Sequence, residues 1–308
     1  MEDYPRTLSE LERRFTTVDA CRGYLASLRW PRSFVCPTCQ GQQAWEMERG
    51  LFLCRQCRRQ VSVTAGTIFQ DSHLPLPLWF RAMWYVTSQK NGASALGVQR
   101  ILGLGSYRTA WSWLQKLRRA MVRPGRDRLL GTVDVDETYV GGAKLGKRGR
   151  GAAGKVLVLI AAQQDGSGIG RIRLLALADA AAASLEPAVQ AAVELGSVVC
   201  TDGWNGYNGL GAMGYEHKRV RAEGQVGENL LPRCHRVASL LKRWLLGTHQ
   251  GAVRAQHLAY YLDEFTFRFN RRTSKSRGKL FYRLAQQAVQ VQPHPYSELI
   301  KPQQMGLG

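Results

Sequence analysis

The sequence lacks any apolar run long enough to cross a bilayer. Its longest uninterrupted apolar stretch is residues 156–162, whereas a membrane-spanning helix needs about 20 apolar residues. The opening residues, MEDYPRTLSELERRF, are charged and contain no signal-peptide pattern. Internal repeats are also absent, and 44% of the residues are hydrophobic, which is the share of a chain with a packed core. These features predict a folded cytoplasmic protein without a membrane partner, and they exclude a disordered or low-complexity chain.

Cysteine is scarce, and its seven residues, an odd number, do not suit a disulfide framework. Four of them instead form two Cys-x-x-Cys pairs, Cys36-Pro-Thr-Cys39 and Cys54-Arg-Gln-Cys57, which are separated by 14 residues. Two such pairs supply the four thiolates of a tetrahedral zinc shell, in which no coordination position stays open for chemistry. The spacing therefore predicts a structural zinc ribbon in a reducing compartment. Packed or idle thiols are expected at the remaining positions, Cys21, Cys200 and Cys234.

Acidic residues are few, with 23 Asp and Glu against 43 Lys and Arg, for a formal net charge of +20. They are missing altogether from residues 72–126, which hold nine basic residues, and from residues 265–297, which hold seven. A solvated basic face is the ordinary explanation of one such stretch. Two long stretches together with a large net charge favour a polyanionic partner, and the sequence therefore predicts nucleic-acid binding.

The first acid-free stretch contains a pattern typical of a helix-turn-helix. Residues 94–102 form a predicted helix, Gly103-Leu-Gly105 a predicted turn, and residues 107–121 a second predicted helix that Ser106 caps. Basic and hydroxyl side chains near the start of the second helix suit DNA contacts, although an ordinary helical hairpin packed on the core gives the same pattern. The candidate DNA-binding residues are Arg108, Thr109, Ser112, Lys116 and Arg119.

A joint rich in proline, glycine and arginine at residues 123–128 divides the chain into two unlike halves. The second half alternates strand-like apolar runs with helical patterns, which predicts an α/β domain with a mixed sheet in a multidomain protein. The predicted strands are residues 132–140, 155–162, 169–176 and 197–201, and the predicted helices are residues 184–195, 231–246 and 255–270. The expected domains are an N-terminal helix and zinc ribbon (1–62), a helical DNA-binding region (63–126), the α/β domain (127–285) and a C-terminal tail (286–308).

Carboxylates lie where two of these strands end. Strand alternation places Asp134 and Asp136 on one face and Glu137 on the other, and Asp202 follows residues 197–201. Two strands that each deliver an aspartate are typical of a magnesium site, although either residue alone suits a strand-end cap or an ion pair. In a chain that binds nucleic acid, the pair predicts a two-metal site for phosphoryl transfer.

The helix predicted at residues 231–246 offers a third group. His235 begins a polar face that continues through Ser239 to Lys242, two turns later. The imidazole suits a metal ligand or a proton carrier, and the lysine suits a phosphate contact. A histidine on a helix is, in general, more often structural than catalytic.

Several motifs together resemble bacterial insertion-sequence transposases of the DDE superfamily, in the branch that carries an N-terminal zinc ribbon. The resemblance extends from about residue 16 to residue 285. The matching stretches are Arg29-Trp-Pro-Arg-Ser-Phe-Val-Cys-Pro-Thr-Cys39, Ala65-Gly-Thr-Ile-Phe69 with Trp79-Phe80, Val133-Asp-Val-Asp-Glu-Thr-Tyr-Val-Gly-Gly142, Cys200-Thr-Asp-Gly-Trp204, residues 235–244, and Tyr261-Leu-Asp-Glu-Phe-Thr-Phe-Arg-Phe-Asn-Arg-Arg272.

The resemblance implies a ribonuclease-H-like catalytic domain in which Asp136 is the first catalytic acid and Asp202 the second. Most DDE enzymes have glutamate at the third position, whereas this branch also has asparagine or histidine there. In this sequence the third position falls on His235, and Lys242 follows it. Asp134, on the same strand face as Asp136, stays open as an alternative third acid.

The activity that the resemblance implies is DNA transposition by two-metal phosphoryl transfer with Mg²⁺ or Mn²⁺. The zinc ribbon and helix-turn-helix would bind the terminal inverted repeats, and the catalytic domain would cut there and join the freed 3′-hydroxyl to target DNA. Because both ends must be held together, a homodimer or larger homo-oligomer is expected, associated with the bacterial nucleoid when on DNA. Two other classes stay open: a DNA-binding regulator that has lost catalysis, and a metal-dependent nuclease that cuts without joining.

Overall fold

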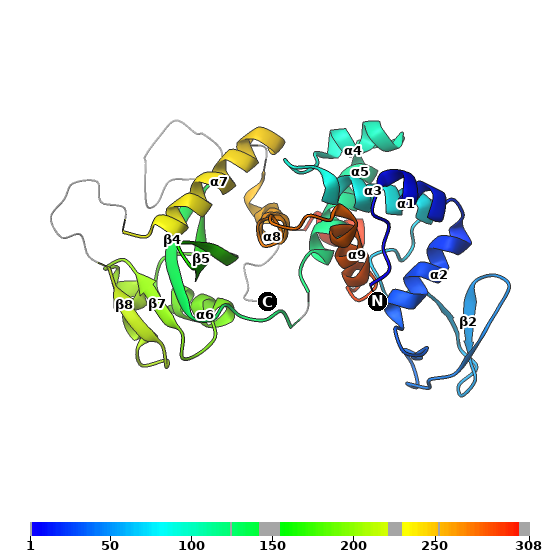
Figure 1. The fold of residues 1–308 in the computed structure, drawn as a ribbon, viewed down its shortest axis with the longest axis horizontal. Coiled ribbons are helices and arrows are strands. Elements are labelled where there is room, and N and C mark those ends of the chain that lie inside the picture. The colour runs from blue at the N-terminus through cyan, green and yellow to red at the C-terminus, as the bar shows by residue number, and fades with distance from the viewer. Residues whose placement is uncertain (1, 124, 142–154, 221–229, 252, 302–308) are drawn as a thin grey trace. The chain divides into compact units, whose positions relative to one another are not determined.

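The protein folds into two compact units. It is described by a computed structural model that covers residues 2–123, 125–141, 155–220, 230–251 and 253–301. The first unit combines residues 1–124 with residues 273–300, and the second is built from residues 125–272 (Figure 1). The first crossing between the units therefore falls inside the joint that the sequence places at residues 123–128.

Two helices and a small sheet open the first unit. The helices are α1 (Leu8–Arg14) and α2 (Val18–Arg29). Thr7 and Thr17 cap them, and each side chain accepts a hydrogen bond from the N–H three residues further on. Three short antiparallel strands follow in the order β1-β2-β3, namely β1 (Ala44–Glu46), β2 (Leu51–Cys54) and β3 (Gln60–Ser62).

A helical hairpin lies where the sequence predicts it. The helices after the ribbon are α3 (Leu76–Ser88), α4 (Ala95–Leu102) and α5 (Tyr107–Ala120). Ser94 caps α4, Gly103 ends it with φ of 63°, and Ser106 caps α5. Glycine suits the turn because its lack of a Cβ allows a left-handed backbone. Trp113 of α5 stacks on Trp79 of α3, with ring centroids 3.9 Å apart, which anchors the hairpin to the unit.

The chain returns to the first unit after residue 272. There α9 (Arg277–Ala288) packs against α3, and α10 (Tyr296–Leu299) packs against α5. This differs from the expected organisation, in which residues 127–285 form the α/β domain and residues 286–308 a tail. The apolar face of α9 gives the physical reason, because Phe281 is fully buried and its ring lies 5.6 Å from that of Phe80.

The second unit contains a five-stranded mixed sheet. Its strands are β4 (Thr132–Val140), β5 (Val156–Asp165), β6 (Gly168–Leu177), β7 (Val198–Thr201) and β8 (Glu216–Arg219). The order is β6-β5-β4-β7-β8, with β5 antiparallel to both neighbours and β7 parallel to β4 and β8. Strands β4, β5, β6 and β7 lie where the sequence predicts strands, so these four predictions are confirmed. The sequence did not indicate β8, because its four residues are polar and mostly exposed.

Helices cover both faces of this sheet (Figure 1). On one face α6 (Ala182–Ala192) packs over Val133, and on the other α7 (Pro232–His249) packs over Ile160. The other helical elements of this unit are η1 (Asn205–Leu210), η2 (Ala255–His257) and α8 (Leu258–Phe269). A mixed sheet between helices, preceded by the cysteine ribbon, confirms the expected multidomain α/β fold.

No helix in the described part of the chain is both long enough and apolar enough to span a membrane.

Candidate metal centres and nucleic-acid interface

The four motif cysteines meet at one point of the first unit. Their Sγ atoms all lie within 4.8 Å of one another, and those of Cys36 and Cys57, and of Cys39 and Cys54, are each 3.6 Å apart. Sulfur atoms placed tetrahedrally about 2.3 Å from zinc stand about 3.8 Å from one another, so the cluster fits a zinc ion. Among the described residues, no other group of three or more potential ligands is gathered so closely.

Each Cys-x-x-Cys pair is held by the same turn. The residue after each pair, Gln40 or Arg58, has a left-handed backbone, with φ of 61° and 59°. Its N–H donates a hydrogen bond of 3.0 Å to the carbonyl of the first cysteine of the pair. In the first pair, hydrogen bonds from the N–H groups of Cys39 and Thr38 lower the pKa of Cys36 to about 6. The turn therefore favours the thiolate of Cys36, which is the form that binds a metal ion.

Little besides the cysteines packs inside the ribbon. Its buried core consists of Cys36, Cys54 and Val61, with Trp30 and Phe34 partly buried against it. Modules with so few apolar contacts depend on an added constraint such as a metal ion for their stability.

In the second unit, β4 and β7 bring the two predicted catalytic acids to neighbouring positions. The strands are parallel, and Asp134 of β4 lies opposite Cys200 of β7. Asp136 comes two residues after Asp134, and Asp202 two residues after Cys200, so the two aspartates lie at equivalent positions along neighbouring segments. Oδ1 of Asp136 accepts a hydrogen bond of 2.9 Å from the Glu137 N–H. Oδ1 of Asp202 accepts one of 3.0 Å from the Trp204 N–H, so backbone donors orient both carboxylates.

The environment of Asp136 disfavours a negative charge. Its side chain is 18% exposed. Burial, together with the charges of Glu137 and Asp202, raises its pKa to about 6, against the opposing effects of the Glu137 N–H and of His235. A cation at this position would offset both the free-energy cost of burying the negative charge and the repulsion between the carboxylates.

The first turn of α7 places His235 beside Asp136. Nε2 of His235 lies 3.3 Å from Oδ2 of Asp136, and the imidazole is 53% exposed. Ser239 and Lys242 are also exposed, in agreement with the predicted polar face. The ligand atoms of Asp136, Asp202 and His235 are not all within 4.8 Å of one another. The three therefore form an open arrangement rather than one closed ligand shell.

Asp134, the alternative third acid, is engaged elsewhere. Its side chain is 4% exposed, and Oδ2 accepts a hydrogen bond of 3.0 Å from Nη1 of Arg233. The Cys234 thiol donates to the carbonyls of Asp134 and Ile160 at 3.3 and 3.4 Å. Sequence reasoning missed Arg233 and assigned Cys234 no role beyond packing, because no local pattern links the start of a helix to a strand that precedes it by 99 residues.

Glu137 points to the opposite side of β4, as strand alternation predicts. Its Oε2 accepts a hydrogen bond of 2.7 Å from the hydroxyl of Tyr207, which is fully buried in η1. Burial and the neighbouring Glu137 raise the pKa of Tyr207, so the hydroxyl stays protonated and donates. This contact ties the segment after β7 to the back of the strand that carries Asp136.

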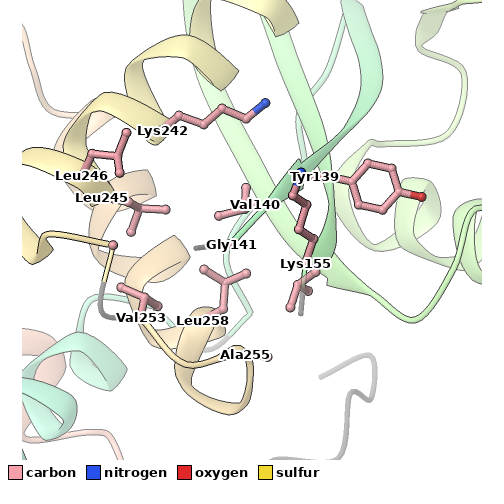
Figure 2. Close-up of a pocket in the computed structure, with 12 residues that line it drawn as sticks. Tyr139, Val140, Gly141, Lys155, Lys242, Leu245, Leu246, Val253, Ala255 and Leu258 are labelled. Atoms are coloured by element: carbon pink, nitrogen blue, oxygen red, sulfur yellow. The ribbon is translucent and has the colours of Figure 1, made fainter. Parts of the chain in front are cut away.

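We call the surface that carries Asp136, Asp202 and His235 the carboxylate face. Lys242 lies further along it, on α7. Its Nζ donates a hydrogen bond of 2.7 Å to Oγ1 of Thr138, and partial burial and the charge of Lys155 lower its pKa. Lys155 and Lys242 both line a pocket of about 270 Å³, whose walls also include Val140 and Leu245 (Figure 2). Two ammonium groups make this end of the face attractive to anions.

The candidate DNA-contacting residues of α5 differ in accessibility. The exposed ones are Arg108 and Arg119, and the half-buried ones are Thr109, Ser112 and Lys116. The guanidinium of Arg108 lies over the ring of Tyr296, 3.8 Å from its centroid. Burial lowers the pKa of Lys116. The two arginines are therefore the most accessible cations among the five candidates.

The fold and these sites define a protein with a four-cysteine ribbon, a helical hairpin and a mixed α/β domain that presents paired aspartates. Residues 128–270 match the ISXO2-like transposase domain, and residues 17–60 match the transposase zinc-ribbon domain. A Halobacterium salinarum protein, described as an uncharacterized protein in transposable element ISH50, is 30% identical over 281 residues. That match covers 79% of this chain and 88% of the Halobacterium protein. The chain therefore belongs to the ISXO2-like transposase family, and the predicted zinc-ribbon DDE resemblance is confirmed.

Proposed function

We propose that the protein moves an insertion sequence by cutting DNA at the element ends and joining the freed 3′-hydroxyl to target DNA. Membership of a transposase family supports this reaction class. The observation that carries the proposal is that His235 lies beside Asp136, while Asp202 follows the neighbouring strand β7 and its charge acts on Asp136.

The donor set of this face fits a divalent cation. Burial, with the charges of Glu137 and Asp202, raises the pKa of Asp136, and a bound cation would offset both effects. Carboxylate oxygens suit Mg²⁺ and Mn²⁺, and the imidazole of His235 favours Mn²⁺ over Mg²⁺. Divalent ions bound here would activate the attacking oxygen and stabilise the leaving oxygen of a phosphodiester.

The side chains of this face take separate roles in the proposed reaction. Asp136 and Asp202 hold the cations from adjacent strands, where backbone N–H groups keep each carboxylate oriented. His235 completes the ligand set, or accepts the proton of the attacking water or hydroxyl. Lys242, two turns along α7, holds a phosphate of the strand being cut.

The first unit would recognise the DNA. In this proposal the ribbon holds Zn²⁺ through Cys36, Cys39, Cys54 and Cys57 and, with the α4–α5 hairpin, binds the terminal inverted repeats. Exposed cations on α5, with a net charge of +20 for the whole chain, contact the phosphate backbone. A homodimer or larger homo-oligomer holds both element ends during the reaction.

The proposal is tested by incubating the purified protein with labelled element ends, a target plasmid and Mg²⁺ or Mn²⁺. Nicked ends together with joined products are the expected result. Nicked ends without joined products would instead identify a metal-dependent nuclease. Specific binding without either product would identify a DNA-binding regulator. Asp136→Asn protein serves as the control for contaminating nucleases.

A further inference from the structure

Three consecutive side chains tie the first turn of α7 to the sheet. Arg233 pairs with the carboxylate of Asp134, Cys234 donates to the Asp134 carbonyl, and His235 lies beside Asp136. The helix has no side-chain N-cap, and its first residue is a proline without an N–H. These contacts, rather than a cap, therefore fix where the helix begins on the sheet.

Stability alone does not explain the ion pair between Asp134 and Arg233. Both side chains are largely withdrawn from water, with 4% and 21% exposure. A buried ion pair is often no more stabilising than apolar side chains of similar volume, and its best-attested use is to select one arrangement among alternatives. Here the alternative is a helix displaced by one residue. Such a shift turns the helix by about 100° and carries His235 away from Asp136.

We infer that Asp134 and Arg233 are positioning residues, whose ion pair sets α7 on the sheet so that His235 faces Asp136. This inference rests on the proposed function, because it takes Asp136, Asp202 and His235 as the cation site. Asp134 is then not a ligand itself. Its Oδ2 is already held by Arg233, so a cation at Asp134 would compete with the guanidinium for the charge of the same carboxylate.

A ligand and a positioning residue respond differently when His235 is removed. A ligand contributes to cation affinity whether or not the imidazole is present. A positioning residue acts through the imidazole, so its substitution has no further effect once the imidazole is gone. The comparison requires wild type, Asp134→Asn, His235→Ala and the double variant. Mn²⁺ affinity is measured in zinc-loaded protein without DNA, from the EPR signal of free Mn²⁺.

We expect Asp134→Asn to weaken Mn²⁺ binding about tenfold, which is the usual effect of removing a partner that orients a metal ligand. In the His235→Ala background the same substitution should change the affinity by less than about twofold. A further tenfold loss in the double variant would overturn the inference and identify Asp134 as a ligand. Equal affinity of wild type and Asp134→Asn would also overturn it.

A second buried ion pair provides a matched control. On α8, Arg268 pairs with the fully buried Glu264 at 2.7 Å, in the same unit as the carboxylate face. Glu264→Gln should lower the thermal unfolding midpoint, as Asp134→Asn does, but leave Mn²⁺ affinity unchanged. A comparable loss of affinity in Glu264→Gln would overturn the positioning role, because general destabilisation would then account for both variants.

Substitution of the arginine supplies an independent test. Arg233→Gln should weaken Mn²⁺ binding as Asp134→Asn does, and Arg233→Lys, which keeps the charge, should recover part of the affinity. The lysine variant also carries the test if Asp134→Asn does not fold. Full wild-type affinity in Arg233→Gln would contradict the inference. A wild-type protein that binds Mn²⁺ and cuts DNA, with affinities unmoved by these substitutions, would leave the proposed function standing and the positioning role refuted.

Discussion

The two candidate metal centres of this protein are built in opposite ways. The ribbon takes four thiolates from residues 36–57, and two similar backbone turns hold them within 4.8 Å of one another. The carboxylate face collects Asp136, Asp202 and His235 from three remote segments, and its imidazole is half exposed. A closed sulfur shell suits a permanent structural ion, whereas an open set of oxygens and one imidazole suits exchangeable ions that also bind substrate.

The contrast also concerns where folding free energy is gained and where it is given up. In the ribbon, a metal ion would replace a core that the short segment does not have. On the carboxylate face, the fold forces Asp136 into a position where its charge is unfavourable. A metal ion in the first centre would therefore stabilise the fold, whereas the buried charge in the second costs stability that a bound cation would restore.

Cys39→Ser should produce the greatest change, because the free energy of zinc binding is also the folding free energy of the ribbon, on the order of 10 kcal/mol. We expect bound zinc to be lost and the ribbon to unfold, while the α/β unit stays folded. Elemental analysis measures the zinc, and limited proteolysis compares the two units. Cys21→Ala, which removes a buried thiol outside the cluster, should keep its zinc. Full zinc content in Cys39→Ser would show that the cluster is not the binding site.

Asp136→Asn and Asp202→Asn should each lower the rate of DNA cleavage by at least roughly a thousandfold, or about 4 kcal/mol of transition-state stabilisation. The DNA affinity of each variant should stay within about twofold of the wild-type value, because neither residue belongs to the first unit, which we propose binds the DNA. Single-turnover cleavage and fluorescence anisotropy measure the two effects. Asp179→Asn is the matched control, since Asp179 is a carboxylate just before α6 that accepts hydrogen bonds from Ala181 and Ser184. Cleavage by Asp136→Asn at the wild-type rate would exclude that residue from catalysis.

The same Asp136→Asn variant should be more stable than wild type at neutral pH without added divalent cations. The pKa of Asp136 is raised from 3.8 to about 6, so its protonated form is favoured by folding and its ionisation opposes folding. The stability that protonation gives is fully present below pH 3.8 and is lost as the pH rises through about 6. We expect a gain of roughly 1–3 kcal/mol at pH 8 that fades toward pH 4, measured by urea unfolding. A pH-independent difference would refute this assignment.

The smallest expected effects concern α5. Arg108→Ala and Arg119→Ala should each lower the slope of log affinity against log salt by about 1, because each removes one phosphate contact. Lys116→Ala should change it less, since Lys116 is half-buried. Arg13→Ala, an exposed arginine on α1, controls for the loss of charge. Salt titrations of anisotropy measure the slopes, and identical slopes for all four variants would remove α5 from the interface.

Local patterns made much of this fold predictable. The four cysteines lie close together in the sequence, and caps at Ser94 and Ser106 mark the two helices of the hairpin. Strand alternation was enough to separate Asp136 from Glu137, because neighbouring residues of a strand face opposite sides.

Long-range packing decided what the sequence did not reveal. No spacing rule connects Arg233 to Asp134 or Tyr207 to Glu137, since each pair forms only when a helix docks on the sheet. The return of α9 to the first unit depends in the same way on the burial of Phe281 against α3. Buried positions on α5, such as Gln115 and Arg118, also follow from tertiary contacts rather than from polarity.

The central claim is that Asp136, Asp202 and His235 together form one site for divalent cations, although they come from three distant segments. Pulsed EPR of bound Mn²⁺ tests it directly, because an imidazole ligand couples its nitrogen nucleus to the metal electron spin. We predict coupling to one histidine nitrogen in wild type and in His217→Gln, and loss of the coupling in His235→Ala. His217 serves as the control because Nε2 of its ring lies 2.8 Å from Oγ1 of Thr201. Mn²⁺ bound without nitrogen coupling in wild type, or with unchanged coupling in His235→Ala, would contradict the account.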